Sequence, residues 1–407
     1  MSYSLLKEGI QNQWVIPTSE TKKLTIDGVT SAYPVYKIRL DQLFFNDKND
    51  RIATWLAQYM SENNISNLDM SDLEAYNQII HRFIVESNPE AIKRTKSNIQ
   101  LVDQREPGVV LMDGRIIDGN RRFTCLRELS SNAKFNYFEA VILERDIKNS
   151  AKEIKLLELE IQHGTESKVQ YNPIDRLVGI YRDIEEEKLL TIEEYARGIN
   201  ESEREVSKKL EQAKLMVEFL EFINAPKQYH IARELELDGP LVELNTMVRN
   251  AKSEEEADQI KISVFTNLVM KPKGDMTRFV RQIKGIMKTE FLNDFLEQQI
   301  DLATTLLDKL EVAPQVTTKV LNEQIRSDEN LKQQLENSMK VAVSKTKREE
   351  TFAKPLQQMN KCYNNLEEID LKILDKLTEQ DLRRLANQVN NLEFLLNEVK
   401  VKVMELL

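Results

Sequence analysis

The stretch from Gly108 to Leu126 constrains the fold most, because it places a β-hairpin directly before a helix. A short apolar run passes through an Asp113-Gly114 turn into a second short run, and Asp118-Gly119 then ends the strand. Apolar residues recur at helical spacing after that glycine. This part of the chain is therefore expected to mix strands and helices.

The junction between hairpin and helix also has the features of a phosphate-binding turn. Gly119 allows the backbone to approach a ligand closely, and the amides after it, at a helix N-terminus, are unpaired donors. Arg121 and Arg122 add two permanent positive charges whose planar forks suit phosphate oxygens. The alternative is a turn glycine followed by two solvated arginines, and these residues alone leave both interpretations open.

Composition limits the class of protein. A chain of 407 residues with 41% hydrophobic content can form two or three folded domains. The net charge of -10 means that any contact with DNA must be a local basic patch. Two cysteines and three histidines exclude the common zinc patterns and a disulfide framework. No signal peptide and no run of about 18 apolar residues is present, so we expect a cytoplasmic protein, with the nucleoid as one setting, and no membrane partner.

Strand signals are concentrated in the first 145 residues, although residues 1–30 carry no firm signal. Besides the hairpin, we expect strands over 35–40 and 135–143 and helices over 51–59 and 69–85. The second of these helices is expected to begin with a capping box from Ser71 to Glu74. After Ala151 the pattern is helical, with helices over 152–162 and from Pro173 onward. The predicted fold class is an α+β N-terminal domain followed by a mainly α-helical half.

Two capping boxes in close succession predict a helix-turn-helix at 190–210. They are Thr191 to Glu194 and Ser202 to Glu205, and the apolar positions around them have helical spacing: Ile192, Tyr195, Ala196, Ile199, Val206 and Leu210. The second helix would present four candidate DNA-binding residues, Ser202, Arg204, Lys208 and Lys209. The alternative is an ordinary helical hairpin, because acidic residues outnumber basic ones here and would sit poorly near DNA phosphates.

A second candidate DNA-binding surface lies on an amphipathic helix within 271–288. Its basic residues recur every three or four positions, opposite an apolar face: Arg278, Arg281, Lys284 and Lys288. The face either docks on DNA phosphates or is simply solvated.

The C-terminal segment has the spacing of a coiled coil. Eight apolar residues alternate in steps of three and four, and we call them the tail stripe: Leu382, Leu385, Val389, Leu392, Leu396, Val399, Val403 and Leu406. We expect this helix to pair with a second copy of the chain as a homodimer. The alternative is that it packs on the helices between Leu302 and Leu335. The predicted domains are thus 1–150 (nucleotide-binding), 151–225 (linker and helix-turn-helix), 226–360 (helical) and 361–407 (coiled coil).

Three short motifs follow one another along the chain and together resemble a known pattern. Asn46-x-x-Asn49-x-Arg51 resembles an N-P-x-N-P-R turn without its prolines, and Asp113 to Arg122 resembles a D-G…G-E-R-R box with Asn120 in place of glutamate. Residues 159–175 are similar to an E-N-x-Q-R…L-N-P-x-E segment. In this order, over roughly residues 33–220, the motifs resemble the ParB/sulfiredoxin-like superfamily, in particular ParB-type proteins with a nucleotide-binding domain before a helix-turn-helix.

The resemblance implies a nucleotide site. In the family the G-x-R-R segment binds the triphosphate of CTP or ATP, and the E-N-x-Q-R helix helps to hold nucleotide and Mg²⁺. The residues carried over are Asn46, Asn49, Arg51, Gly119, Asn120, Arg121, Arg122, Gln162 and His163. The acidic position of the E-N pair is Leu159 here and its amide is Glu160, while Asn120 lacks a carboxylate for a cation. Nucleotide binding is therefore expected more strongly than hydrolysis.

Three functions remain open. The leading one is a nucleotide-gated DNA-binding dimer that acts in DNA partition, regulation or mobile-element biology. The second is a ParB-like nuclease or phosphotransferase in defence against phage and other foreign DNA, for which the candidate catalytic carboxylates are Asp113, Asp118, Glu158 and Glu160. The third is a helical adaptor that binds a protein partner and keeps a vestigial nucleotide site. A reductase role for Cys125 is not expected, because its spacing with Phe123 and Leu126 predicts burial.

Overall fold

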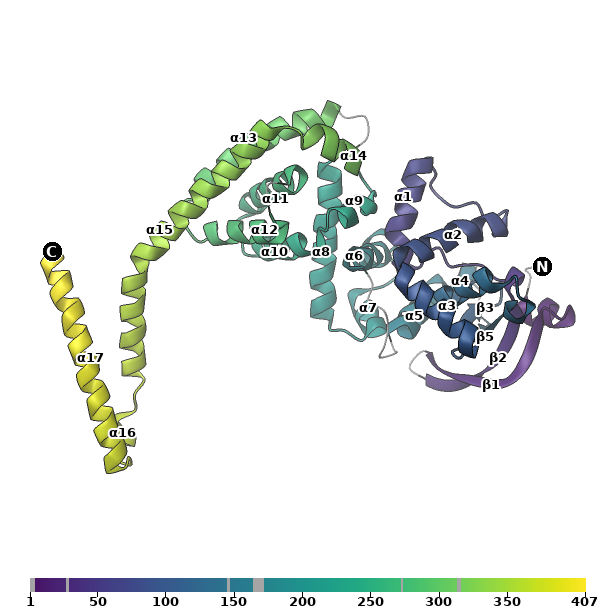
Figure 1. Cartoon of the computed structure of the whole chain (residues 1–407), viewed down its shortest axis with the longest axis horizontal. Helices are drawn as coiled ribbons and strands as arrows, with labels where there is room; N and C mark the ends of the chain where they lie inside the picture. Colours follow the sequence, from purple (N-terminus) through teal and green to yellow (C-terminus); the bar gives the residue numbers. More distant parts are fainter. Residues whose placement is uncertain (1–3, 27–28, 145–146, 164–171, 272–273, 313–315) are drawn as a thin grey trace. The chain divides into compact units, whose positions relative to one another are not determined.

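The computed structural model describes residues 4–26, 29–144, 147–163, 172–271, 274–312 and 316–407. The chain divides into two compact units, Met1–Val343 and Ser344–Leu407. Figure 1 shows the elements of the chain in sequence colours, with the strands gathered near the N-terminus. In the described residues no helix is both long and apolar enough to cross a bilayer.

A five-stranded mixed sheet organises the N-terminal part of the first unit. Its strands are β1 (Val15–Ile26), β2 (Val29–Arg39), β3 (Gly108–Leu111), β4 (Ile116–Asp118) and β5 (Tyr137–Leu143), in the order β1-β2-β5-β3-β4. The β3 and β5 strands are parallel and the other neighbours are antiparallel. The three strand regions predicted from the sequence are confirmed. The β1 strand was not predicted, because most of its residues are exposed at the edge of the sheet and lack a regular apolar alternation.

Helices cover both faces of this sheet. The residues of β3 are buried throughout, as expected for a strand with a layer on each side. Three helices supply one layer: α2 (Leu73–Ser87), α3 (Pro89–Val102) and α4 (Asn120–Leu129). On the other face, Ile154 and Leu157 of α5 (Ile147–His163) pack against Val109 and Leu111. The pocket described below lies where α4 begins.

Two local predictions in this domain need correction. The α2 helix begins after Asp72, whose carboxylate accepts from the amides of Glu74 and Ala75, so the capping box at Ser71 was wrong. Aspartate is itself a strong N-cap, and Ser71 instead donates its hydroxyl to Asp69. The α3 helix was missed, although Asn88 caps it and proline occupies its first position. A short 3₁₀ turn, η3 (Asp50–Ile52), precedes α1 (Ala53–Asn63).

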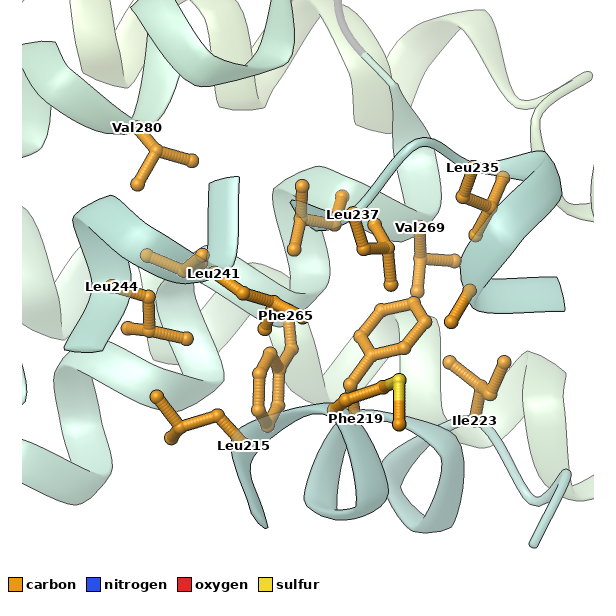
Figure 2. Close-up of a cluster of buried hydrophobic side chains, with 14 of the residues drawn as sticks. Leu215, Phe219, Ile223, Leu235, Leu237, Leu241, Leu244, Phe265, Val269 and Val280 are labelled. Atoms are coloured by element: carbon orange, nitrogen blue, oxygen red, sulfur yellow. The ribbon is translucent and has the colours of Figure 1, made fainter. Parts of the chain in front are cut away.

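The rest of the first unit is helical. Its elements are α6 (Pro173–Tyr181), the π-helical turn η5 (Arg182–Glu186), α7 (Ile192–Ile199), α8 (Glu203–Phe222), α9 (Tyr229–Glu234), α10 (Asp238–Arg249), α11 (Glu254–Met270), α12 (Met276–Ile286), α13 (Leu292–Val312), α14 (Thr318–Val320) and the first part of α15 (Glu329–Glu367). Most of these helices share one core, in which the rings of Phe219 and Phe265 stand edge to face with centroids 5.5 Å apart (Figure 2). The α7 helix and the start of α8 pack in a second, smaller cluster. The predicted fold class, an α+β domain followed by a mainly helical half, is confirmed.

The second unit contains the rest of α15, then α16 (Leu371–Leu374) and α17 (Glu379–Leu406). No residue of α17 is buried, and seven of the eight tail-stripe residues are exposed, from 41% at Leu382 to 77% at Leu406, while Leu385 is half-buried. The distal part of α15 carries a second exposed apolar row at the same spacing: Phe352, Leu356, Met359, Tyr363 and Leu366. Pairing of the tail with a second copy, like the four predicted domain limits, stays a prediction.

Candidate functional site

The predicted phosphate turn has an unusual backbone. Gly119, between β4 and α4, has φ 102°, and a Cβ there would lie 2.7 Å from Cζ of Phe138. Only glycine fits this position. The first helical hydrogen bond runs from the amide of Phe123 to the carbonyl of Gly119, over 2.9 Å. No side chain caps α4 in the described chain, so the first amides of α4 are left as donors for an anion.

Residues from two distant motifs line one pocket at this turn. Asn49 and Arg51 come from the segment that leads into α1, and Asp118, Gly119, Asn120 and Arg121 come from the β4–α4 junction. Ile84, Ser87 and Ile117 complete the lining. The pocket measures ≈ 40 Å³, room for about three water molecules, so it suits one phosphate group and leaves a sugar and base outside.

The pocket is electropositive and contains an unsatisfied polar group. Burial lowers the pKa of Arg121, and the nearby guanidinium groups of Arg51, Arg122 and Arg94 lower it further. In the described part of the chain, Arg121 has no carboxylate partner. The side chain of Asn120 is 8% exposed, and its Oδ1 has no hydrogen-bond partner among the described residues. An anion would relieve the repulsion between the arginines.

Arg122 lies apart from this pocket. Its Nη2 is 3.0 Å from Oδ2 of Asp118, and its Nη1 donates to the carbonyl of Glu106. Lys22 of β1 adds a second cation 3.7 Å from Asp118. Neighbouring residues on a helix point about 100° apart, and of the two arginines it is Arg121 that lines the pocket. Arg122 instead joins α4 to β4 and to the segment before β3. The shared phosphate role that the sequence suggests for the two arginines stays a prediction.

The remaining predicted nucleotide-binding residues are placed differently. Asn46 faces away from the pocket: its Oδ1 accepts from the amide of Lys48 over 3.1 Å, and its Nδ2 is 3.5 Å from Oε2 of Glu158. The side chains of Gln162 and His163 lie outside the described residues. Two contributors were missed from the sequence, Ser87 in the lining and Arg94 beside it. The Asn88-Pro89 helix start between them was the available signal.

The four candidate catalytic carboxylates do not converge. Asp113 accepts from the amide of Arg115 in the hairpin turn, and Asp118 pairs with Arg122. Glu158 is buried beside Lys155, and Glu160 is half-buried on the same helix. Within the described ranges, no group of three histidines, cysteines or carboxylates could hold a metal ion. Cys125 is buried, as expected, and burial raises the pKa of its thiol to about 12, which makes it a poor nucleophile.

The predicted helix-turn-helix region forms two helices joined by a tight turn. Thr191 and Glu194 make a complete capping box at α7, and Asn200 ends that helix in the left-handed conformation. Most of the predicted apolar positions share one core cluster, with Ile192 packed on it. At α8 the box is incomplete: Ser202 caps the amide of Glu205, but the carboxylate of Glu205 instead accepts from Lys208.

Four of the seven predicted DNA-binding cations are paired with glutamates. Lys208 pairs with Glu205 and Lys209 with Glu201, each at 2.6 Å. On α12, Arg281 and Lys284 both contact Glu243 of α10, at 2.7 and 3.4 Å. Arg204, Arg278 and Lys288 are exposed. Arg204 and Arg278 lie in the first turns of α8 and α12, and Lys288 follows the end of α12. Fewer cations are therefore available for contact with DNA than the sequence predicted.

A larger pocket, ≈ 570 Å³, lies on the same domain but is a weaker candidate. Its two arginines are paired, Arg39 with Asp41 and Arg127 with Glu74. Both arginines of this pocket are thus already paired with carboxylates. We therefore take the smaller pocket at the start of α4 as the candidate site.

Nine chains among solved structures match this protein. No protein-family model matches the sequence, and no curated protein matches it. The chain is similar to the C2221 form of a Pnob8-like ParB-N domain, with 12% sequence identity and a TM-score of 0.32, over 72% of this chain and 99% of that one. At this level of similarity, function has to be inferred from the residues of the site.

Proposed function

We propose that the pocket at the start of α4 binds the phosphate groups of a nucleotide, CTP or ATP. The observation that carries this proposal is that Asn49 and Arg51 share a pocket with Gly119 to Arg121, about 70 residues away in sequence. Unpaired backbone amides and clustered guanidinium groups are the donors that phosphate oxygens require.

The residues favour binding over hydrolysis. Asp118 is the single carboxylate in the lining, and it is paired with Arg122 and near Lys22. Mg²⁺ would therefore be held mainly by phosphate oxygens and water, with Asp118 as the one carboxylate of the described lining beside it. Nicking of supercoiled plasmid in the presence of Mg²⁺ or Mn²⁺ would instead favour the nuclease alternative.

Replacing Arg121 with alanine is expected to weaken CTP or ATP binding by about 10- to 100-fold. One charge-assisted contact contributes about 1.5–3 kcal/mol, which corresponds to this range. Isothermal titration calorimetry on the full chain measures it. Lys93→Ala is the matched control, since it removes one positive charge from an exposed position on α3 outside the pocket lining. Equal affinities of wild type, Arg121→Ala and Lys93→Ala would exclude this pocket as the nucleotide site.

We further propose that the α7–α8 pair and the end of α12 contact DNA. The support is the packed helix-turn-helix geometry and the exposed cations Arg204, Arg278 and Lys288. Replacing all three with alanine should reduce the slope of log affinity against log salt by up to about 2.7, since each phosphate contact contributes about 0.9. Fluorescence anisotropy with a duplex over a salt series measures the slope. If wild-type binding does not change with salt, the glutamate-paired surface favours the adaptor alternative, with a protein partner instead of DNA.

The tail stripe supports a homodimer as the working unit. Seven of its eight apolar side chains are exposed, as expected for a helix that pairs with a second helix of the same spacing. A nucleotide bound more tightly by one arrangement of the dimer would shift its population toward that arrangement.

A further inference from the structure

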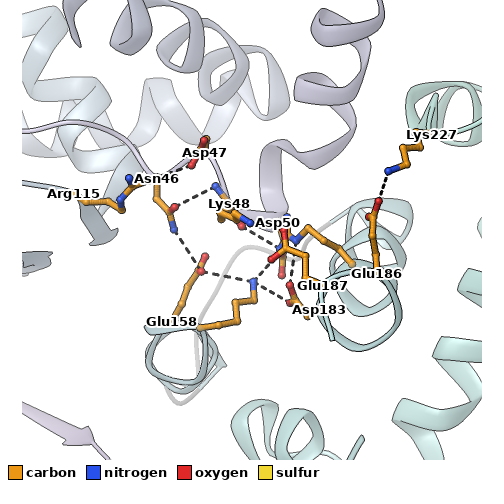
Figure 3. A network of polar contacts seen from close by, with 12 residues as sticks. Asn46, Asp47, Lys48, Asp50, Arg115, Glu158, Asp183, Glu186, Glu187 and Lys227 are labelled. Carbon is orange, nitrogen blue, oxygen red and sulfur yellow. Dashed lines mark hydrogen bonds and ion pairs between the residues drawn. The ribbon is translucent and has the colours of Figure 1, made fainter. Parts of the chain in front are cut away.

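Five charged residues form a buried network next to the candidate site. Asp50 lies in η3, Lys155 and Glu158 lie in α5, and Arg182 and Asp183 lie in η5. Four of them are at most 5% exposed. Figure 3 shows how the side chains of this network converge from three elements that are distant in sequence.

Lys155 is at the centre of the network. Its Nζ is 3.1 Å from Oδ1 of Asp50, 3.2 Å from Oδ2 of Asp183 and 3.6 Å from Oε2 of Glu158. Arg182 contacts two of these carboxylates. Its Nη2 is 2.6 Å from Oδ1 of Asp50, and its Nε is 3.1 Å from Oδ1 of Asp183. Asp50 therefore accepts from both cations.

Asp50 also belongs to the turn that lines the candidate site. It stands between Asn49 and Arg51, which both line the phosphate pocket. Behind it, α6 approaches so closely that a Cβ on Gly179 would lie 2.6 Å from Cγ of Asp50. The turn is thus held on one side by the network, while its other side forms the pocket.

Charge in the network is not balanced when every group is ionised. Three carboxylates face two cations, so one proton is needed for neutrality. Burial, together with the nearby carboxylates of Asp50 and Asp183, raises the pKa of Glu158 to about 7 although Lys155 and Arg182 oppose this shift. Ionised Glu158 would compete with Asp50 for Lys155.

We propose that this network, through Asp50, positions Asn49 and Arg51 for phosphate binding and makes the affinity of the site depend on the charge of Glu158. Asp50 is a positioning residue, because it contacts Lys155 and Arg182 and not the bound anion. The proposal rests on the proposed nucleotide function. It deepens that function by linking the pocket to α5 and η5.

The test compares two isosteric variants, Asp50→Asn and Asp183→Asn. Each removes one carboxylate contacted by Lys155 and Arg182, and in each the ionised Glu158 can restore neutrality, so the structural costs are matched. Only Asp50 is joined to the lining residues. With inorganic triphosphate as the probe and calorimetry on the full chain at about pH 8, where Glu158 is ionised in wild type as well, we expect Asp50→Asn to bind about tenfold more weakly and Asp183→Asn to bind within about twofold of wild type.

The pH profile provides a second readout. Wild-type affinity should fall between about pH 6 and about pH 8, because ionised Glu158 adds a negative charge near the anion and draws Lys155 from Asp50. Glu158→Gln, fixed as neutral, should show only the smaller change due to the ionisation of triphosphate itself.

Each outcome decides between the two proposals. If wild type binds triphosphate and both aspartate variants bind equally well or equally poorly, positioning through Asp50 is wrong while the phosphate site stands. A Glu158→Gln profile identical to wild type overturns the link to Glu158. If wild type does not bind triphosphate at all, the proposed function fails and this inference falls with it.

Discussion

Replacing Lys155 with methionine is expected to lower the free energy of unfolding by about 3–5 kcal/mol. The substitution keeps the length of the side chain but leaves Asp50, Glu158 and Asp183 buried with Arg182 as the remaining cation of the network. Removing one partner from a buried ion cluster exposes the full desolvation cost of the charges that remain.

Chemical denaturation at neutral pH measures this loss. Lys152→Met is the matched control: Lys152 lies one turn earlier on α5, is exposed, and pairs with Glu194 at the surface. Such a surface pair contributes less than about 1 kcal/mol. Equal destabilisation by the two substitutions would show that the network does not act as a buried cluster.

The stability of this cluster should also depend on pH. The pKa of Glu158 in the folded protein is about 7, above its ordinary value of 4.5, so the folded state binds more protons between these values. Stability therefore falls as pH rises through this window, and the loss is complete above about pH 7. Lowering the pH should recover part of the stability lost in Lys155→Met, because protonation removes charge from the unpaired carboxylates.

The parts of the site that are local in sequence could be predicted. Gly119 followed by Arg121 is a turn and a helix start whose chemistry depends on neighbouring residues, and Asn49 with Arg51 is a similarly short motif. Their meeting in one pocket followed from the family resemblance and not from composition or periodicity.

The buried network could not be predicted, and the reason is physical. Asp50, Lys155 and Asp183 are far apart in sequence, and a charged residue in isolation is expected at the surface. Their burial is tolerable only because they meet. The different surroundings of Arg121 and Arg122 could not be predicted for another reason: a motif gives residue order, whereas the fold places Arg121 in the pocket lining and pairs Arg122 with Asp118.

Introducing aspartate at both Leu392 and Leu396 is expected to convert a homodimer into a monomer. These positions lie in the middle of the tail stripe and are 42% and 53% exposed in the single chain. Each buried leucine contributes about 1.5–3 kcal/mol, and the double substitution removes four leucines from a two-chain interface. The dissociation constant should therefore rise by more than about 10,000-fold.

The tail stripe also suits a second α17 better than it suits α15 of the same chain. The tail stripe has eight apolar positions, whereas the row on α15 from Phe352 to Leu366 has five. Continued toward the N-terminus at the same spacing, that row meets the charged residues Glu349 and Lys345. A second α17 matches the stripe over its whole length. Light scattering on the full chain measures the mass, with Asn390→Asp plus Asn397→Asp as a control that adds the same charge outside the stripe. A dimer that survives the leucine substitutions, or a wild-type mass equal to one chain, would exclude the tail as the dimer interface.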